Sequence, residues 1–361
     1  MRRALPILVL AAATLAFGLL PSTAPLALPP GRTSRAEVLE TDDSGLQLQG
    51  LIEFGTQKLR VRLPDGNVRT AHNELRAQLE LDTKFKPGDR ALVILGDEPL
   101  QVRGHWRTGY LMVLFGGFAL LLVAFGGWTG LKALLSFLFS CAVVWKLLVP
   151  LCLRGWNAQL TAFACVSVLT GVIFYLVAGW TRKGIAAFAG AMLGVSVSLV
   201  LADFFAAALH VNGATMPFVQ TLIYSGFQGL DIADVFVGAV ILGSSGAVMD
   251  LAMDIAAGVD EVARHRPDLP RRELFMSGIR VGRSVVGTMT TTLLLAYSGG
   301  YLTLLMVFAA EGTSLLDIVN STLVSAEIVK TLVGSFGLVL IAPFTALASA
   351  FIFKSHASAF S

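Results

Sequence analysis

Long apolar runs dominate the chain and predict helices that cross a membrane. The hydrocarbon core of a bilayer is about 30 Å thick, so a spanning helix needs roughly 20 predominantly apolar residues. Eight segments approach or exceed this length: 4–20, 109–127, 131–151, 158–179, 185–209, 232–258, 285–309 and 331–353. We therefore predict an α-helical polytopic membrane protein with about eight transmembrane helices.

The stretch 31–108 has a different pattern, with short alternations of apolar and polar residues. Residues 45–54 and 57–63 alternate, Pro-Asp-Gly-Asn at 64–67 predicts a turn, and 90–95 forms a last apolar run. Alternation with a period of two is typical of strands that have one buried face. The pattern predicts a small β-rich, barrel-like domain.

The distribution of charge supports this division. Only 14% of the residues are charged, against about a quarter in soluble domains. Residues 31–108 hold twelve Lys/Arg and twelve Asp/Glu, so the charge is concentrated in the predicted β domain. We predict three parts: an N-terminal signal anchor and linker (1–30), an extracytoplasmic β-rich domain (31–108) and a membrane domain of about seven helices (109–361).

Basic residues predict the orientation of the chain in the membrane. With the N-terminus inside, ten of the Lys/Arg after residue 108 fall in cytoplasmic segments, and in that part of the chain only Arg154 and Lys330 fall outside. An excess of Lys/Arg on the cytoplasmic side is the usual orientation signal. The pattern predicts a protein of the bacterial inner membrane with both termini in the cytoplasm and 31–108 outside.

Two acidic residues stand inside a predicted span. Asp250 and Asp254 are four residues apart near the inner end of 232–258, so they lie on one face of a helix. Carboxylates inside a membrane are costly and usually face the interior of a bundle or water. They predict a cation or proton site; the alternative is a pair solvated by headgroups or paired with the basic loop that follows.

Hydroxyl side chains begin the next predicted span. Thr288, Thr290, Thr291 and Thr292 reach the same depth as Asp250, because consecutive spans run in opposite directions. Thr288 and Thr292 are therefore candidate ligands beside Asp250. In the alternative interpretation, each hydroxyl bonds the carbonyl of its own helix.

Acidic residues also gather near the predicted outer face. Asp203 ends one span, and Glu327 lies with other acids in outer segments where Lys330 is the main opposing charge. A mouth lined by one sign of charge concentrates counter-ions. Asp203 and Glu327 are thus candidate cation-attracting residues, although acidic outer loops need no function. The outer segments 211–230 and 311–330 are semi-apolar and predict surface helices or segments that re-enter the membrane.

Other motifs indicate packing or orientation. Gly190 and Gly194 form a GxxxG pattern that predicts close helix packing. The basic stretch 264–283 predicts a helix at the membrane surface. Cys141, Cys152 and Cys165 have no metal-ligand spacing and are interpreted as packing residues. A net charge of +3 gives no argument for nucleic acid.

No nucleotide loop, nucleophile elbow, zinc-protease motif or cofactor fingerprint occurs. The sequence therefore predicts a non-enzymatic protein without a cofactor or a resident metal.

Three motifs resemble the YibE/F-like family of bacterial membrane proteins: GAVMDLAMDIA at 246–256, GTMTTTLLLAY at 287–297 and AEIVKTLVGSFGLVLIAPFTA at 326–346. The outer stretch 57–67 with 88–94 is similar to the outer domain of that family. Thr291 stands where the family pattern has asparagine, which implies an altered site if that asparagine is a ligand. The resemblance implies the topology and draws attention to Asp250, Asp254, Thr288 and Glu327, but it implies no substrate.

Two hypotheses of function follow, and a third remains open. The first is a transporter or channel-like protein for a small solute or cation, with Asp250 at its centre. The second is a membrane scaffold or a subunit of an envelope complex that binds an envelope protein through 31–108. The third is an intramembrane enzyme acting on a lipid-linked substrate through Asp250 and Asp254. In all three, the lipid bilayer surrounds the helices.

Overall fold

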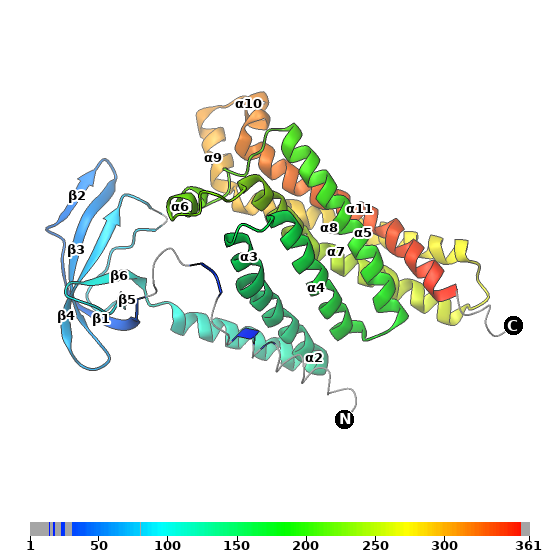
Figure 1. The fold of residues 1–361 in the computed structure, drawn as a ribbon, viewed down its shortest axis with the longest axis horizontal. Helices are drawn as coiled ribbons and strands as arrows, with labels where there is room; N and C mark the ends of the chain where they lie inside the picture. The colour runs from blue at the N-terminus through cyan, green and yellow to red at the C-terminus, as the bar shows by residue number, and fades with distance from the viewer. Residues whose placement is uncertain (1–13, 15–16, 19–22, 26–30, 80, 355–361) are drawn as a thin grey trace. The chain divides into compact units, whose positions relative to one another are not determined.

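A computed structural model describes residues 14, 17–18, 23–25, 31–79 and 81–354. Its described residues form two compact units that divide between Ala124 and Phe125. Most of the predicted anchor 4–20 lies outside the described residues. Figure 1 shows a β barrel in one unit and a bundle of long helices in the other.

The barrel contains six strands in one mixed sheet. Its strands are β1 (Thr33–Asp42), β2 (Leu46–Gln49), β3 (Ile52–Arg62), β4 (Val68–Arg76), β5 (Arg90–Ile94) and β6 (Leu100–His105). The order is β1-β5-β6-β4-β3-β2, and β1 also pairs with β3, which closes the sheet. The β4–β6 pair is parallel and the other pairs are antiparallel. This is the Greek-key arrangement of an OB-type barrel.

The predicted barrel-like domain is confirmed, with one local difference. Residues 45–54 are a hairpin and not a single alternating run, because Gly50 adopts a positive φ of 67° and turns the chain between β2 and β3. Strand β3 then runs without a break from Ile52 to Arg62, so it contains the second predicted run except for its last residue. The positive φ favours glycine, which has no Cβ to clash in that conformation.

A buried glutamine organises the interior of the barrel. Gln57 is fully buried, and its amide donates to the Asp43 carboxylate and to the Phe85 carbonyl. Its side-chain oxygen accepts from the Phe85 amide and from Asn73. All its polar atoms are therefore paired, which allows a polar side chain to sit among buried apolar residues without the cost of an unmade hydrogen bond. Gln57 ties β3 to β4 and to the loop before β5.

The remaining chain is helical. Its elements are α2 (Thr108–Val143), the π-helix η1 (Val144–Leu148), α3 (Val149–Leu153), α4 (Ala158–Ala178), α5 (Arg182–Ala208), α6 (Val219–Tyr224), α7 (Ile232–His265), α8 (Arg271–Gly300), α9 (Leu302–Glu311), α10 (Leu315–Asn320) and α11 (Thr322–Lys354).

The number of candidate spans is five, or six if one bent pair counts as a span, among the residues that the structure describes. Seven of the eight predicted spans lie in the described part of the chain, so the prediction of about eight spans is supported only in part. Predicted spans 109–127 and 131–151 form one candidate, Thr108–Leu153, which is interrupted where Gly127 leaves the helical conformation (φ 51°, ψ −125°). Predicted span 285–309 is broken, since α8 and α9 meet at a bend of 68°.

Two predicted segments outside the spans are also different in the structure. The predicted surface helix 264–283 is not a separate helix. Its first residues belong to the end of α7, and the residues from Arg271 onward belong to α8, which continues to Gly300. The predicted outer segment 311–330 contains α10 and the first turns of α11, so Glu327 lies on a long helix and not in a loop. Periodicity missed these extensions because their polar residues lower the local hydropathy. Segment 211–230 contains the short helix α6, and re-entry into the membrane stays a prediction.

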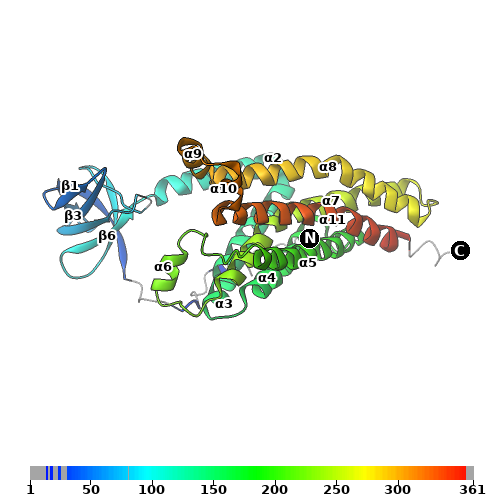
Figure 2. The same ribbon diagram turned by 90° about the horizontal axis from the view of Figure 1, so that it is seen from above.

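Glycines set the packing of the long helices, which run side by side in Figure 2. Gly190 and Gly194 of α5 lie against Thr345 and Ile341 of α11, so the predicted GxxxG contact is confirmed. A Cβ at Gly190 would come too close to Thr345 for any real contact. Small residues allow such approaches between membrane helices, where dispersion contacts replace the hydrophobic effect.

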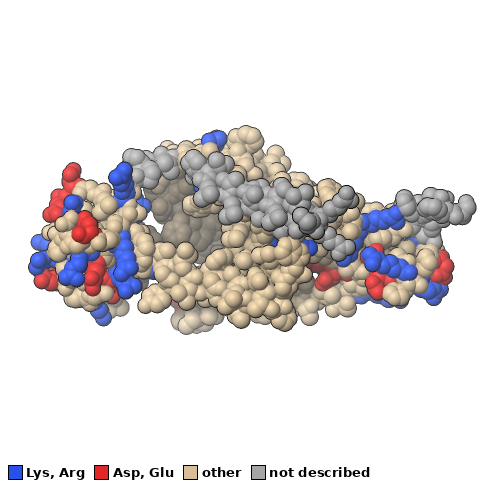
Figure 3. All heavy atoms as spheres, turned by 90° about the horizontal axis from the view of Figure 1, so that it is seen from below, with Lys and Arg blue, Asp and Glu red and all other residues tan. Residues whose placement is uncertain are grey.

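Charge is distributed unevenly over the surface. Figure 3 shows Lys, Arg, Asp and Glu crowded over the barrel, and on the helical unit it shows them mainly at one end, with a broad uncharged area beside them. That end contains the junction of α7 and α8, where Arg264, Arg266, Arg271 and Arg272 lie. The uncharged area is the surface expected of a helical unit in contact with lipid.

Candidate functional site

The contacts between α7 and α8 fix the relative depth of the predicted site residues. Gly258 approaches Val281, Gly282 approaches Ile255, and Gly243 approaches the Tyr297 hydroxyl. The two helices are therefore antiparallel, since residue numbers fall along α7 as they rise along α8. Between these contacts, Asp250 lies at the level of Thr288 and Asp254 at the level of Arg283 and Ser284. The sequence prediction that the threonines reach the depth of Asp250 is confirmed.

These residues share one exposed surface, which we call the polar face. Along α7, one stripe of residues three or four apart is exposed, and α8 presents a second exposed stripe beside it. The polar face consists of Gly246, Asp250 and Asp254 on α7 and of Ser284, Thr288 and Thr292, which are four residues apart on α8. The other sides of α7 pack against α4, α5 and α11.

The threonine hydroxyls on α8 bond within their own helix. Thr288 donates to the Val285 carbonyl at 2.8 Å, and Thr292 donates to the Thr288 carbonyl at 2.9 Å. The alternative of self-bonded threonines is thus observed. Such a hydroxyl has donated its only proton, but its oxygen still offers lone pairs to a cation or a donor.

Asp250 and Asp254 have no partner within the described part of the chain. Neither carboxylate takes part in a hydrogen bond or an ion pair there, and the two carboxylates repel each other. No group of three or more His, Cys, Asp or Glu side chains is close enough to hold a metal ion, in the ranges that the structure describes. The polar face is therefore chemically unsatisfied: it offers acceptor oxygens and unpaired carboxylates.

Glu327 lies in a different environment. Its carboxylate contacts the Lys330 ammonium at 2.5 Å, and both side chains are 15% exposed. The Tyr301 hydroxyl is also a hydrogen-bond partner of Glu327, and the Lys330 ammonium lies over the rings of Phe236 and Tyr301. Glu327 is thus neutralised inside the protein, which was not expected of an outer-loop acid.

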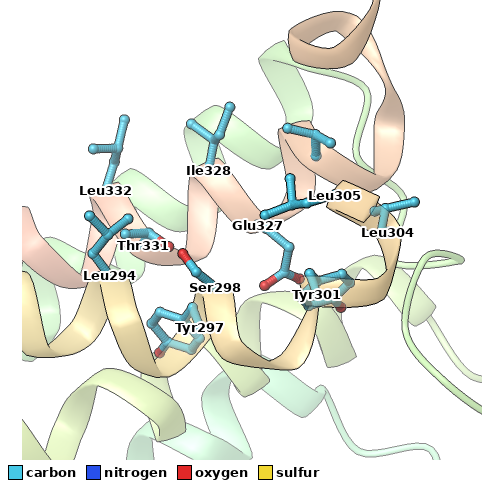
Figure 4. Close-up of a pocket in the computed structure, with 11 residues that line it drawn as sticks. Leu294, Tyr297, Ser298, Tyr301, Leu304, Leu305, Glu327, Ile328, Thr331 and Leu332 are labelled. Atoms are coloured by element: carbon cyan, nitrogen blue, oxygen red, sulfur yellow. The ribbon is translucent and has the colours of Figure 1, made fainter. Parts of the chain in front are cut away.

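A cavity of about 230 Å³ opens beside this pair. Figure 4 shows the Glu327 carboxylate pointing toward Tyr301, with Tyr297 and Ser298 on the same stretch of α8. The rest of the lining is largely aliphatic. The Tyr297 hydroxyl is buried and has no hydrogen-bond partner among the described residues. The cavity therefore combines an apolar wall with a few polar groups from α8 and α11.

The Glu327 pair and Asp250 are separate sites. Lys330 lies over Phe236, which precedes Asp250 on α7 by fourteen residues, or about 21 Å of helix. Along this distance, α8 carries Ser298, Tyr297 and the threonines. The sequence analysis put Glu327 near the outer face and Asp250 in the inner part of the bilayer, and the structure likewise places them at two depths of the same bundle.

Asp203 belongs to a third group of polar side chains. It is exposed near the end of α5 and interacts electrostatically with Asp234 of α7, as does Asp231. The Asp234 carboxylate accepts from the amides of Asn157 and Gln159 on and before α4. The predicted acidic cluster is therefore partly satisfied by amide donors that sequence analysis did not single out.

A family model described as YibE/F-like protein matches residues 114–355. The chain belongs to the YibE/F-like family. This matched range contains all the predicted site residues of the YibE/F-like chain and excludes the β barrel. No curated protein and no solved structure matches it. Family membership and the long apolar helices together indicate a membrane protein.

Sequence analysis missed the residues that pair with the carboxylates of Glu327 and Asp234. Lys330 was counted as an outer basic residue, and Tyr297, Tyr301, Asn157 and Gln159 were not singled out. A signal was present in one case: Glu327 and Lys330 are three residues apart and share a helix face. The amide and tyrosine partners come from other helices, so no local spacing reveals them.

Proposed function

We propose that this protein moves a small cation across the bacterial inner membrane, as a transporter or channel-like protein without a catalytic step. Asp250 is the central ligand in this proposal. Asp254 lies one turn away, and the oxygens of Thr288 and Thr292 assist. The observation that carries the proposal is a pair of carboxylates without partners on a helix long and apolar enough to cross a membrane.

The chemistry of the polar face favours a cation over an anion or an apolar solute. Carboxylate and hydroxyl oxygens are the ligands that hard cations take in proteins. The hydroxyl protons of Thr288 and Thr292 are already donated to the α8 backbone, so their oxygens are free to act only as acceptors. An ionised group in the membrane that lacks a protein partner usually marks an ion or proton pathway.

The cavity beside Glu327 gives this pathway a second polar position. Its Lys330 partner keeps Glu327 from acting as a free cation ligand, but Ser298 and the tyrosines continue the polar side of α8 toward Thr291. In the proposed orientation, with both termini in the cytoplasm, the Glu327 end is outside and the Asp254 end is inside. Asp203 and its neighbours would then attract cations to the outer surface.

Flux in proteoliposomes tests the proposal. Uptake of Na⁺, K⁺, Mg²⁺ and Mn²⁺, and of protons, is measured with wild-type protein and with Asp250→Asn at matched amounts of folded protein. We expect at least one cation to be taken up by the wild type and a loss of that uptake in Asp250→Asn. Asp97→Asn, an exposed acid in the barrel, is the control that retains flux. Equal flux in Asp250→Asn would refute the role of Asp250.

A second candidate function is supported by the barrel. Leu51 is 98% exposed and Leu79 is 76% exposed. Both lie at the same end of the barrel, since Phe54 pairs with Arg76 at the end of the β3–β4 ladder, and Leu51 precedes Phe54 by three residues as Leu79 follows Arg76 by three. Exposed apolar residues that gather at one end of a domain are typical of a protein-binding surface. We propose an envelope protein as the partner in this scaffold function.

The scaffold function predicts a different loss. Deletion of 35–104, or the double change Leu51→Ser and Leu79→Ser, abolishes function and the crosslink to a defined envelope protein. Val68→Ser at the other end of β4 is the matched control, because Val68 is also exposed. Unchanged function in the deletion would exclude this candidate.

A further inference from the structure

A cavity of about 640 Å³ lies between the barrel and the start of α2. Its lining comes from the start of β5, the end of β6 and the first turns of α2, and all of it belongs to the compact unit that ends at Ala124. Ligand cavities in proteins commonly have volumes of about 300–1,000 Å³. The cavity is therefore large enough to hold a small molecule or part of a lipid.

Backbone hydrogen bonds connect the parts of this lining. The Trp106 amide donates to the Arg90 carbonyl at 2.7 Å, which extends the pairing of β5 and β6 by one residue beyond His105. Helix α2 begins two residues later, and the Leu111 amide donates to the Arg107 carbonyl at 3.1 Å. The chain thus passes directly from the sheet into the helix, and Arg90 and Arg107 line the same cavity.

The barrel side of the cavity carries positive charge. Arg90 and Arg107 are exposed, and neither guanidinium group has an ion-pair or hydrogen-bond partner in the part of the chain that the structure describes. The acid in the lining is Asp89, whose carboxylate accepts from the Lys86 amide at 2.7 Å and so stabilises its own turn. The lining therefore offers two unpaired cationic groups to an anion.

The α2 side of the cavity is apolar. Leu111 and Leu114 are exposed, and they follow Arg107 at four and seven residues, so the three share one side of the helix. Residues 108–131 carry no charged side chain, and α2 belongs to a candidate membrane span. Leu114 lies about 10 Å along the helix from Arg107. This distance is within one leaflet, since half of the hydrocarbon core is about 15 Å thick.

Aromatic side chains lie between the two parts of the lining. Trp106 adjoins Arg107, and Tyr110 lies one turn further along α2, before Leu114. Trp and Tyr are enriched where the hydrocarbon core meets water, because each combines an apolar ring with a polar atom. From the arginines to the leucines, the lining thus changes from cationic to aromatic to aliphatic. The same order describes a membrane lipid from its phosphate to its acyl chain.

We propose that this cavity binds one anionic phospholipid of the leaflet on the barrel side. Its phosphate lies between Arg90 and Arg107, and the first part of an acyl chain lies against Leu111 and Leu114. Arginine suits this role because its planar guanidinium group donates two parallel hydrogen bonds to phosphate oxygens. Basic side chains beside a membrane helix are typical sites for anionic headgroups. The bound lipid contacts both the sheet and α2, and so joins them at the membrane surface.

This proposal goes beyond cation transport and does not depend on it. Asp250 and the threonines of α8 take no part in the lipid site. Loss of flux in Asp250→Asn with unchanged lipid binding would support transport and leave the proposal intact. Absence of lipid binding in a protein that moves cations would contradict the proposal and leave transport intact.

Photolabelling of the full-length protein in membranes tests the proposal. The protein is reconstituted in phosphatidylcholine vesicles that contain a small fraction of phosphatidylglycerol with a photoreactive acyl chain, and the labelled peptides are identified by mass spectrometry. We expect label in segment 106–114, and an excess of unlabelled phosphatidylglycerol should remove it. An excess of diacylglycerol, which lacks the phosphate, or of inorganic phosphate, which lacks the chain, should not remove it.

Two matched pairs of arginines make the test specific. Arg90→Gln combined with Arg107→Gln should reduce the label in segment 106–114 about tenfold, since the phosphate loses both cationic partners. Arg60→Gln combined with Arg69→Gln removes two arginines that form exposed ion pairs elsewhere on the barrel, and the label should remain. Thermal unfolding checks that each variant is folded, and the competition in wild-type protein decides the question independently of any variant.

Any of four outcomes overturns the proposal. The first is the absence of label from segment 106–114. The second is equal labelling of the Arg90 and Arg107 double variant and of its matched control. The third is competition by diacylglycerol or by inorganic phosphate that equals competition by phosphatidylglycerol. The fourth is a label that is present in vesicles but absent in the membranes of cells that produce the protein, because another protein then fills the cavity.

Discussion

Two carboxylates in the same helical bundle differ in their exposure and in their partners. Glu327 is 15% exposed and is held by Lys330, with Tyr301 as a further partner. Asp250 is exposed and has no partner among the described residues. A paired internal charge is a component of the fold, whereas an unpaired charge on a membrane helix needs something that is not part of the single chain. The comparison therefore separates a structural site from the proposed binding site.

The first prediction breaks the paired site. Lys330→Met leaves the Glu327 carboxylate without its cation, and removal of one partner from a buried ion pair costs about 3–5 kcal/mol of unfolding free energy. The measurement is chemical unfolding of the detergent-solubilised protein.

Two controls accompany this variant. Glu327→Leu combined with Lys330→Met should recover most of the loss, since no charge then remains unpaired. Arg264→Met breaks the pair with Asp260, in which Arg264 is 70% exposed, and should cost less than about 1 kcal/mol. Equal losses for Lys330→Met and Arg264→Met would show that the Glu327 pair is not a structural site.

The second prediction compares packing on the closed and the open sides of the bundle. Gly190→Ala places a methyl group against Thr345, and overpacking of this kind costs about 1–3 kcal/mol. Gly246→Ala places the same group in open space on the polar face, where alanine favours the helix by about 0.5–1 kcal/mol. Both are measured by unfolding of monomeric protein in detergent. A loss in Gly246→Ala as large as that in Gly190→Ala would mean that the face is packed within one copy.

The third prediction concerns Asp250 in the absence of a ligand. Asp250→Asn removes a carboxylate that has no partner, so the unfolding free energy of the cation-free protein should not fall. Thermal unfolding in chelator-treated, low-salt buffer measures this. A loss of more than about 1 kcal/mol would place Asp250 with Glu327 as a structural residue.

The smallest effect is expected in the barrel. The hydrogen bond from Gln57, and then that from Lys84, lowers the pKa of the Asp43 carboxyl below its usual value. A lowered folded-state pKa contributes stability above the unfolded-state pKa, and this contribution is lost as pH falls through the folded-state pKa, below about 4. Asp43→Asn should flatten this acid dependence in the barrel. Hydrogen exchange of barrel peptides in the full-length protein, compared at the same pH, measures it; an unchanged acid dependence would contradict the assignment.

The sequence predicts the parts of this protein that depend on local patterns. Apolar length predicts the helices, and alternation predicts the barrel, because both are properties of consecutive residues. The number of spans differs from the prediction at two places: a kink at Gly127 joins two predicted spans into one candidate, and the chain bends by 68° after Gly300. The opposite directions of consecutive spans were sufficient to place Thr288 at the depth of Asp250.

The partners of charged residues were beyond the reach of local patterns. Glu327 is neutralised by Lys330 of its own helix. Tyr301 at the end of α8 and Phe236 of α7 complete the environment of this pair. Asp234 likewise depends on Asn157 and Gln159, which are more than seventy residues away in the chain. Whether a carboxylate has a partner depends on the tertiary structure. The presence or absence of that partner decides which acidic residue is a candidate ligand.

The most direct test of the central claim is thermal unfolding of wild type and Asp250→Asn against Na⁺, K⁺, Mg²⁺, Mn²⁺ and a series of pH values. A ligand that binds only the folded state stabilises it by about 2.7 kcal/mol at about 100 times its dissociation constant. We predict a stabilisation by at least one cation, or by protons, in the wild type that is absent in Asp250→Asn and present in Asp97→Asn. Identical responses of wild type and Asp250→Asn to every cation and pH would contradict the claim that Asp250 is a binding site.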